Sequence, residues 1–445
     1  MVYGFPGTTE QHLVSGELKY IIDKERPARI KMRELSLSII DASMRSSDEV
    51  RIKYASKQAR IANAYKKWIG QIGGLKEMTA LDKKIKKEQA YLKQAATKPE
   101  WQAKYGGLID QMNQLIAEEE QHDFSYKMGI EYLYVGPELF KMGRTMDKII
   151  KDYPTWLEKG EVEANIEKYK KGGAGFFKNY DAKIDQKIFE LLTIEYHDQL
   201  KLGDIKVYLK GSSAEYLYSK SKLTNEERYM AFLDKLSAKS LKKMAKDPGY
   251  AFYTKMNQRF MTEHVAKYRG TKRKMTELLK TYVAGKYEMF PDAAHWADAN
   301  GTMRITYGQL EGSAPTDGMK YTEHTTLAGI AQKYHTGNPD FELLPRMIEL
   351  SEKKEHGRYG QDGELWVCFT GSNHTTGGNS GSPVLDENGY LMGLNFDRTW
   401  ESTMSDYHFD SKRCRNITVD IRYVLWVMDI YSGAKHLVDE MVLKQ

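Results

Sequence analysis

Residues Thr375–Trp400 read TTGGNSGSPVLDENGYLMGLNFDRTW, and this stretch indicates how the last third of the chain folds. Short segments rich in Val, Leu, Tyr and Phe alternate here with Gly, Asn and Asp, which is typical of antiparallel strands. Between two of them, Asn388-Gly389 is a favoured two-residue hairpin turn. Segments of the same texture flank the stretch: RITYGQL (304–310), ELWVCFT (364–370) and RNITVDI (415–421). The last third is therefore predicted to form an antiparallel sheet or half-barrel. Two helical segments interrupt it, TTLAGIAQKYH and LLPRMIELSEKK, and a C-terminal helix closes the chain.

A serine stands in the tight GGNSG turn of residues 377–381. Acyl transfer needs a nucleophilic oxygen on such a turn, with backbone N–H groups directed at the developing oxyanion. Because glycine adopts dihedral angles closed to other residues, Gly378 can direct its own N–H and that of Ser380 into one small cavity. The motif therefore favours Ser380 as a nucleophile and Gly378 as part of an oxyanion hole. The alternative is a purely structural turn before a hairpin.

The middle of the chain has a different texture. From about residue 14 to 290, apolar residues recur at helical spacing, and Pro99 is the one proline between Arg29 and Gly136. We therefore expect three regions: a short strand-like segment (1–13), a helical domain (14–295) and a β domain (296–445). A chain that leaves a β domain for a large helical insertion and then returns would explain this order, and it gives an α+β fold.

Composition excludes some classes of partner. The chain is 41% hydrophobic and 29% charged with a net charge of +6, and its basic and acidic residues are interleaved. This pattern predicts solvated helix faces and no nucleic-acid partner. No apolar run is long enough to cross a membrane. Histidines in metal-binding spacing are missing, so we expect no metal and no cofactor. Cys368 and Cys414 are too few for a disulfide framework, and the sequence leaves open whether they pair.

The stretch TGGNSGSPVLDENGYLMGLNFDRTWE resembles the nucleophile segment of the dipeptidyl-peptidase 7 and 11 family of bacterial serine exopeptidases. The resemblance extends to FELLPRMIELSEKKEHGRYG and ITVDIRYVLWVMD around it, and to RIKYASKQARIANAYKKWIG in the helical region. It implies a chymotrypsin-like β-barrel half with a large inserted all-helical domain. It also implies removal of dipeptides from oligopeptides with a free N-terminus, a homodimer, and a periplasmic location, although the chain shows no signal peptide.

The same resemblance assigns the substrate site. It places Asp397 and Asn63 at the free α-ammonium of the substrate, Phe396 in the pocket, and Arg398 at the base of the specificity pocket. An arginine there resembles the dipeptidyl-peptidase 11 type, which cleaves after Asp or Glu, because a guanidinium offers a planar fork for a carboxylate. The alternative is a solvated arginine on a hairpin edge. Neighbouring strand residues face opposite sides, so Asp397 and Arg398 can serve one site only where the strand ends or bulges.

The chain departs from the family in one respect. The family's catalytic His and Asp precede the segment that FPGTTEQHL (5–13) resembles, so the chain is expected to be the C-terminal portion and to be inactive alone. His374 lies close to Ser380 in sequence, but a base must approach from a separate wall. Two alternatives remain open. One is a catalytically inactive relative that binds peptides or partners, and the other is an endopeptidase, which the helical cap disfavours.

Overall fold

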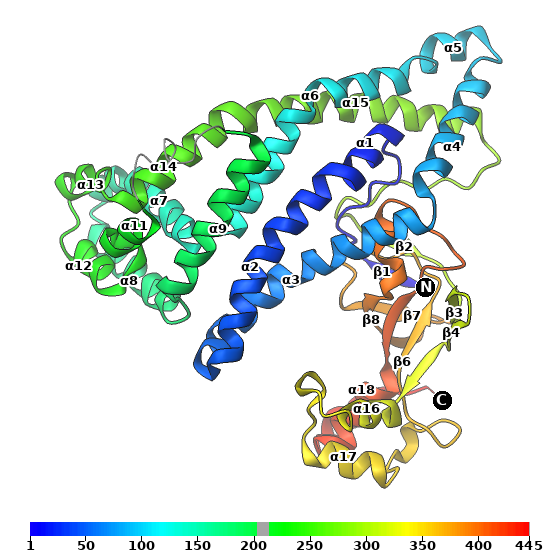
Figure 1. Cartoon of the computed structure of the whole chain (residues 1–445). Coiled ribbons are helices and arrows are strands. Elements are labelled where there is room, and N and C mark those ends of the chain that lie inside the picture. Colours follow the sequence, from blue (N-terminus) through cyan, green and yellow to red (C-terminus); the bar gives the residue numbers. More distant parts are fainter. Residues whose placement is uncertain (203–212, 445) are drawn as a thin grey trace. The chain divides into compact units, whose positions relative to one another are not determined.

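The computed structural model describes residues 1–202 and 213–444, which form two compact units (Figure 1). We call them the sheet unit (Met1–Leu13, Gly70–Lys86 and Phe290–Gln445) and the helical unit (Val14–Ile69 and Lys87–Met289). The units interleave along the chain. Residues 70–86, which the sequence places in the helical region, lie within the sheet unit.

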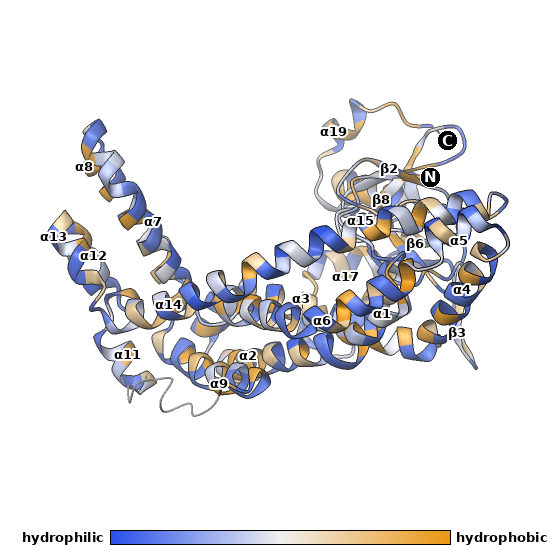
Figure 2. Ribbon diagram, turned by 90° about the horizontal axis from the view of Figure 1, so that it is seen from above, coloured by the Kyte–Doolittle hydropathy of each residue, from blue (hydrophilic) through white to orange (hydrophobic). Residues whose placement is uncertain are grey.

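The helical region consists of amphipathic helices, as its periodicity predicts. Helices α3 and α4 run across the unit boundaries, and Figure 2 shows hydrophobic and hydrophilic residues alternating along the ribbons. The helices are α1 (Ser15–Tyr20), α2 (Arg26–Ser46), α3 (Asp48–Glu77), α4 (Ala80–Ala95), α5 (Pro99–Tyr105), α6 (Leu108–Ile130), α7 (Glu138–Lys159), α8 (Val162–Phe177), α9 (Ala182–Leu200), α11 (Ala214–Lys220), α12 (Glu226–Asp234), α13 (Ala238–Met244), α14 (Pro248–Arg259) and α15 (Ala266–Met289).

The core of the helical unit is rich in aromatic side chains. Tyr132, Phe140 and Phe189 are buried in it, with ring centroids 5.0 Å apart for the first pair and 6.0 Å for the second. Such rings bury large apolar areas, and edge-on pairs add about 0.5–1.5 kcal/mol beyond that burial. The helical unit is therefore held by a hydrophobic core of its own.

A buried carboxylate fixes the start of α7. Asp185 on α9 is 1% exposed and accepts the first backbone N–H groups of α7, from Glu138 at 2.6 Å and Leu139 at 3.0 Å. It also accepts the hydroxyl groups of Tyr180 at 3.2 Å and Tyr218 at 2.9 Å. The free N–H groups at a helix N-terminus need such a partner, because burying them unpaired is costly.

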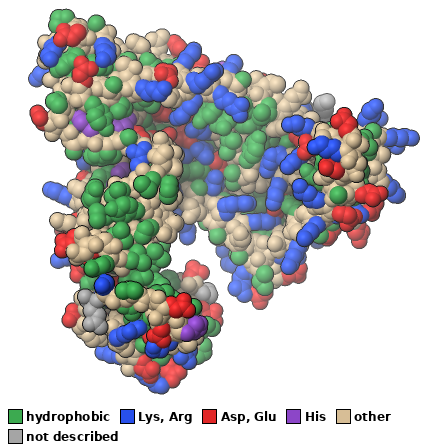
Figure 3. Space-filling view, turned by 180° about the vertical axis from the view of Figure 1, so that it is seen from behind, with side chains coloured by type: hydrophobic (Ala, Val, Ile, Leu, Met, Phe, Trp, Pro, Cys, Tyr) green, Lys and Arg blue, Asp and Glu red, His purple; other side chains and the backbone are tan. Residues whose placement is uncertain are grey.

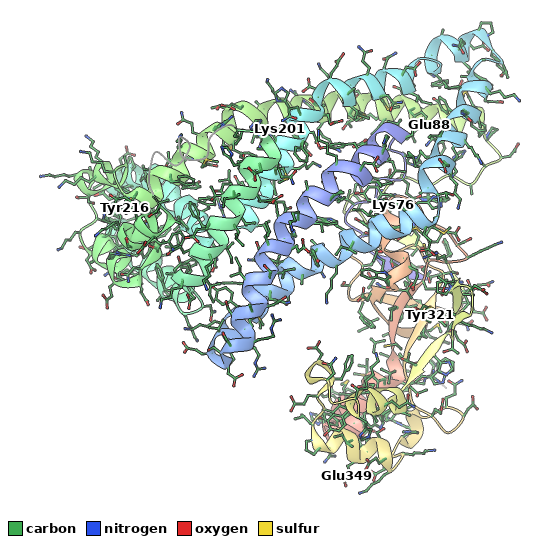
Figure 4. All side chains as sticks on the ribbon, viewed as in Figure 1. Lys76, Glu88, Lys201, Tyr216, Tyr321 and Glu349 are labelled. Atoms are coloured by element: carbon green, nitrogen blue, oxygen red, sulfur yellow. The ribbon has the colours of Figure 1, made fainter. Side chains whose placement is uncertain are left out.

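The sheet unit contains a seven-stranded antiparallel sheet in the order β2-β1-β7-β8-β9-β6-β5. Its strands are β1 (Val2–Gly4), β2 (Arg304–Thr306), β5 (His324–Thr326), β6 (Trp366–Gly371), β7 (Ser382–Leu385), β8 (Leu391–Arg398) and β9 (Asn416–Asp420). Strand β1, from the strand-like N-terminal segment, pairs with both β2 and β7. A separate hairpin joins β3 (Ser313–Thr316) to β4 (Met319–Tyr321), on which Figure 4 labels Tyr321.

The predicted α+β class is confirmed, while the closed shape of a chymotrypsin-like barrel stays a prediction, because the described strand order ends in the edges β2 and β5. The β7–β8 hairpin is also confirmed, but its turn is wider than predicted. Leu385 pairs with Leu391, and the Asp386 carboxylate accepts the N–H groups of Asn388 and Tyr390, both at 2.8 Å. This side chain stabilises a longer loop in which Gly389 has φ +84°.

Both predicted helical interruptions of the β region form, as α16 (Leu327–Tyr334) and α17 (Pro345–Glu352). The closing helix is shorter than predicted. It begins as α18 (Ile421–Trp426) and is interrupted near Gly433, with φ +68°, before α19 (Lys435–Asp439). Trp426 is fully buried here. Among the described residues, no helix combines the length and the apolar character needed to cross a bilayer.

Candidate active site

The serine turn lies between β6 and β7 and is fixed by its own hydrogen bonds. The Asn379 side chain accepts the Thr376 N–H at 3.1 Å, while the Thr376 carbonyl accepts the Asn379 N–H at 3.0 Å. Further along, Ser382 N–H donates to the Asn379 carbonyl at 3.0 Å, and Gly381 N–H donates to the Asn395 carbonyl of β8 at 2.7 Å. The turn is therefore closed on itself and attached to the neighbouring strand.

Gly378 is required in this turn for two reasons. Its φ is +105°, a region that favours glycine. A Cβ atom at Gly378 would also lie 2.4 Å from the Phe5 carbonyl oxygen and 2.9 Å from the Gly7 nitrogen. Gly7 in turn donates its N–H to the Gly377 carbonyl at 2.7 Å. The segment after β1 therefore lies directly against the serine turn.

Ser380 is exposed, and its hydroxyl donates to the Phe396 carbonyl at 3.3 Å. Within residues 1–202 and 213–444, neither the Gly378 N–H nor the Ser380 N–H donates to a protein acceptor. Two N–H groups without acceptors beside an exposed hydroxyl are what an oxyanion hole requires. In the same residues no imidazole hydrogen-bonds to Ser380.

His374, the histidine nearest to the serine in sequence, is engaged elsewhere. Its Nε2 lies 3.0 Å from the Ser405 carbonyl oxygen, so this nitrogen carries the proton and donates it. The Gln11 amide lies 3.1 Å from Nε2 and 3.3 Å from Nδ1, and the ring stacks on Phe409 with centroids 4.5 Å apart. Burial lowers the pKa of His374, so the ring is held neutral in this packed position.

Strand β8 bulges where the sequence required it. Its register against β9 shifts between Asn395 and Asp397. Phe396, within the bulge, is 45% exposed, and Asp397 is exposed with its carboxylate accepting the Arg398 N–H at 2.8 Å. The strand ends at Arg398. The condition under which Asp397 and Arg398 can serve one site is therefore met.

Arg398 is not a solvated arginine on a hairpin edge. Its Nη1 donates to the Thr375 carbonyl at 3.2 Å, to Ser405 Oγ at 2.8 Å and to Asp406 Oδ1 at 2.8 Å. Its Nη2 donates to Asp406 Oδ2 at 3.3 Å. The guanidinium is thus held at the start of the serine turn by a buried ion pair, with side chains 11% and 6% exposed.

Asp406 is the site residue that sequence reasoning missed. It ends the 3₁₀ segment Trp400–Asp406 in a polar stretch, SDYHFD, that carries no recognisable spacing. The signal available was only an acidic residue a few positions after an arginine, which is far too common to identify a pair.

Of the predicted site residues, Ser380, Gly378, Phe396, Asp397 and Arg398 lie together in the sheet unit. Asn63 lies on α3 in the helical unit, where it is exposed.

The described side chains hold no group of three His, Cys, Asp or Glu residues able to bind a metal ion. Cys368 and Cys414 are both free thiols. The large hydrophobic side chains that are exposed in the sheet unit include Phe5, Met303, Tyr307, Phe396 and Trp400. Figure 3 shows exposed hydrophobic side chains on one face of the molecule.

The chain is similar to known dipeptidyl-peptidases. The chain is 37% identical over 450 residues to an Asp/Glu-specific dipeptidyl-peptidase of Flavobacterium psychrophilum, covering 100% of this chain and 62% of the relative. It is 33% identical to a dipeptidyl-peptidase 7 of Phocaeicola vulgatus, covering 100% of this chain and 62% of that protein. The chain thus spans less than two thirds of the length of these relatives.

Solved structures show the same fold. The crystal structure of Porphyromonas endodontalis DPP11 in complex with the dipeptide Arg-Glu matches with a TM-score of 0.84 at 27% identity, over 99% of this chain and 63% of that one. The sequence profile described as Peptidase S46 matches residues 1–443. This chain therefore belongs to the peptidase S46 family.

Proposed function

We propose that the chain carries the nucleophile and the substrate-binding residues of a serine exopeptidase that releases N-terminal dipeptides with Asp or Glu in second position. The observation that carries this proposal is the anchored guanidinium of Arg398, bound to the Thr375 carbonyl at the start of the serine turn. The names of several relatives, Asp/Glu-specific dipeptidyl-peptidases, support the same specificity.

The chemistry begins at Ser380. Its hydroxyl oxygen attacks the carbonyl carbon of the second substrate residue and gives its proton to the base, and the Gly378 and Ser380 N–H groups stabilise the oxyanion. The amine of the remaining peptide leaves with a proton, and water then hydrolyses the acyl-enzyme to release the dipeptide. A histidine base is expected, by the family resemblance, from the part of the relatives that this chain does not match.

The substrate would be held at both ends of its dipeptide. Asp397, exposed beside the serine turn, would supply an anion for the free α-ammonium. A contact of Asn63 with the same ammonium stays a prediction that rests on the family resemblance alone. Phe396 offers an exposed apolar surface, and Arg398 binds the acidic side chain. A fixed distance between the ammonium site and Ser380 would limit the product to two residues. This arrangement disfavours an endopeptidase.

Three further points rest on the family resemblance alone: a periplasmic location, a homodimer and a chymotrypsin-like barrel. The inactivity of the 445-residue chain by itself also stays a prediction. The alternative of an inactive peptide-binding relative is not supported, because the relatives are named as peptidases.

The test uses the full product of the gene and, in parallel, the chain alone. A fluorophosphonate probe should label the full product at Ser380, and Ser380→Ala should abolish the labelling. Labelling of another serine would refute the assignment of the nucleophile. Labelling and turnover of the chain alone would refute its predicted inactivity.

Specificity is tested with matched dipeptidyl-coumarin substrates that carry Glu or Leu in second position. Arg398→Gly should lower kcat/KM for the Glu substrate by about a hundredfold, because a buried carboxylate is left without donors. The Leu substrate should lose less or gain. Arg358→Gly, at an exposed arginine of the same unit, serves as the matched control. Equal changes for both substrates would show that Arg398 is structural.

A further inference from the structure

Asp406 makes contacts with both the specificity arginine and the serine turn. Its carboxylate accepts Nη1 and Nη2 of Arg398, at 2.8 Å and 3.3 Å. The same carboxylate accepts the Thr376 hydroxyl at 2.7 Å and the Gln71 side-chain amide at 3.0 Å. Asp406 is only 5% exposed, and all these partners belong to the sheet unit. One buried carboxylate thus joins the end of β8, the serine turn and α3.

The contact with Thr376 ties this carboxylate to the nucleophile. Thr376 begins the turn that carries Ser380, and its N–H and carbonyl both bond to Asn379, the residue before the serine. Arg398 and Thr376 share a single acceptor atom, Asp406 Oδ1. Asp406 thus links the guanidinium to the serine turn, in addition to the direct bond from Arg398 Nη1 to the Thr375 carbonyl at 3.2 Å.

One edge of the guanidinium makes few contacts within the described part of the chain. Its Nη1 is used by three acceptors, while Nη2 makes the one contact with Asp406, and Nε donates to no acceptor in the described part of the chain. The Nε–Nη2 edge presents two nearly parallel N–H groups, the geometry that binds a carboxylate at two points. Anchoring through Nη1 fixes that edge before the substrate arrives, so less side-chain freedom is lost on binding.

We propose that Asp406 is a positioning residue for acid specificity: it holds Arg398 so that the Nε–Nη2 edge meets a substrate carboxylate at a fixed distance from Ser380. This inference rests on the proposed function. A different role for the same contacts predicts the opposite change in the preference for acidic residues. If Asp406 merely competed with the substrate for the charge of Arg398, removing its charge would strengthen the preference for acidic residues.

The test compares kcat/KM for matched Glu and Leu dipeptidyl substrates in the full gene product. Asp406→Asn keeps the size of the side chain but places an amide against the donors of Arg398. We expect the ratio of Glu to Leu activity to fall about tenfold to a hundredfold, since a charge-assisted pair is lost. In the Arg398→Gly background, the same change should leave the ratio nearly unaltered, because Asp406 acts through Arg398.

Two further variants separate the contacts. Thr376→Val removes the hydroxyl bound to Asp406 and should lower activity on both substrates with little change in their ratio. Ser405→Ala removes one neutral acceptor from Arg398 and should lower the ratio by roughly two- to fivefold, a loss typical of one hydrogen bond. If thermal unfolding shows that Asp406→Asn does not fold, Ser405→Ala carries the test, and an unchanged ratio there overturns the inference.

The remaining outcomes are distinct. A ratio that rises in Asp406→Asn, or a fall of equal size with and without Arg398, would overturn the positioning role. An unaltered protein that prefers Glu in an Arg398-dependent way, combined with an unchanged ratio in Asp406→Asn, would overturn this inference and leave the proposed function standing. An unaltered protein that hydrolyses neither substrate would overturn both.

Discussion

Replacing Gly378 by alanine should destabilise the serine turn strongly, and the neighbouring glycines provide a graded control. At φ +105° a side chain is strained by about 1–2 kcal/mol. The new Cβ would also lie 2.4 Å from the Phe5 carbonyl oxygen, so the backbone must move. The hydrogen bond from the Gly7 N–H to the Gly377 carbonyl, at 2.7 Å, joins the same two segments and would be broken by that movement. Losing it adds about 1 kcal/mol. The free energy of unfolding should therefore fall by about 2–4 kcal/mol.

The two controls isolate the causes. Gly377→Ala meets no atom within 4 Å and has no positive φ, so its effect should stay within about 0.5 kcal/mol. Gly381→Ala has φ +82° but open space around it, so it should show strain alone, about 1–2 kcal/mol. The expected order of destabilisation is therefore 378, then 381, then 377.

The assay must report on this part of the sheet unit, because two units need not unfold together. Hydrogen exchange of backbone amides in residues 1–7 and 376–382 does so, since local opening there is read directly. Exchange in both segments should speed up in Gly378→Ala and stay unchanged in Gly377→Ala. If Gly378→Ala behaved like Gly377→Ala, the packing of the N-terminal segment against the serine turn would be wrong.

Two more predictions concern buried polar groups. Asp185→Ala should lower the free energy of unfolding of the helical unit by about 3 kcal/mol, because the N–H and hydroxyl donors around it lose their acceptor. Urea denaturation measures this change. The control Asp198→Ala, at an exposed position on the same helix, should change the free energy little, and equal effects of the two variants would refute the role of Asp185. Burial lowers the pKa of His374 in the folded protein below its unfolded value of about 6.5. The unfolded state therefore binds more protons than the folded state in acid. The free energy of unfolding should fall as the pH drops through about 6.5 towards the pKa of the folded protein. His374→Gln should flatten this dependence, whereas the exposed His436→Gln should not; identical pH profiles for the two variants would contradict the argument.

The features that depend on local physics could be predicted from the residues alone. Helical periodicity identified the helical region, and alternating β-rich segments identified β6 to β9. The GGNSG turn was recognisable because the ability to adopt a positive φ, as Gly378 does here, is a property of glycine itself. Because side chains alternate along any strand, Asp397 and Arg398 can share a site only where the strand is irregular. Strand β8 has such an irregularity, the register shift between Asn395 and Asp397.

Tertiary structure decided which distant segments meet. Val2 pairs with Thr306 and with Val384, and no local pattern specifies such partners. Residues 70–86 join the sheet unit although they are helical, because packing rather than periodicity assigns a helix to a core. The Arg398–Asp406 pair is the clearest case. This ion pair depends on burial and geometry, so it forms only after β8, the serine turn and α3 have been brought together.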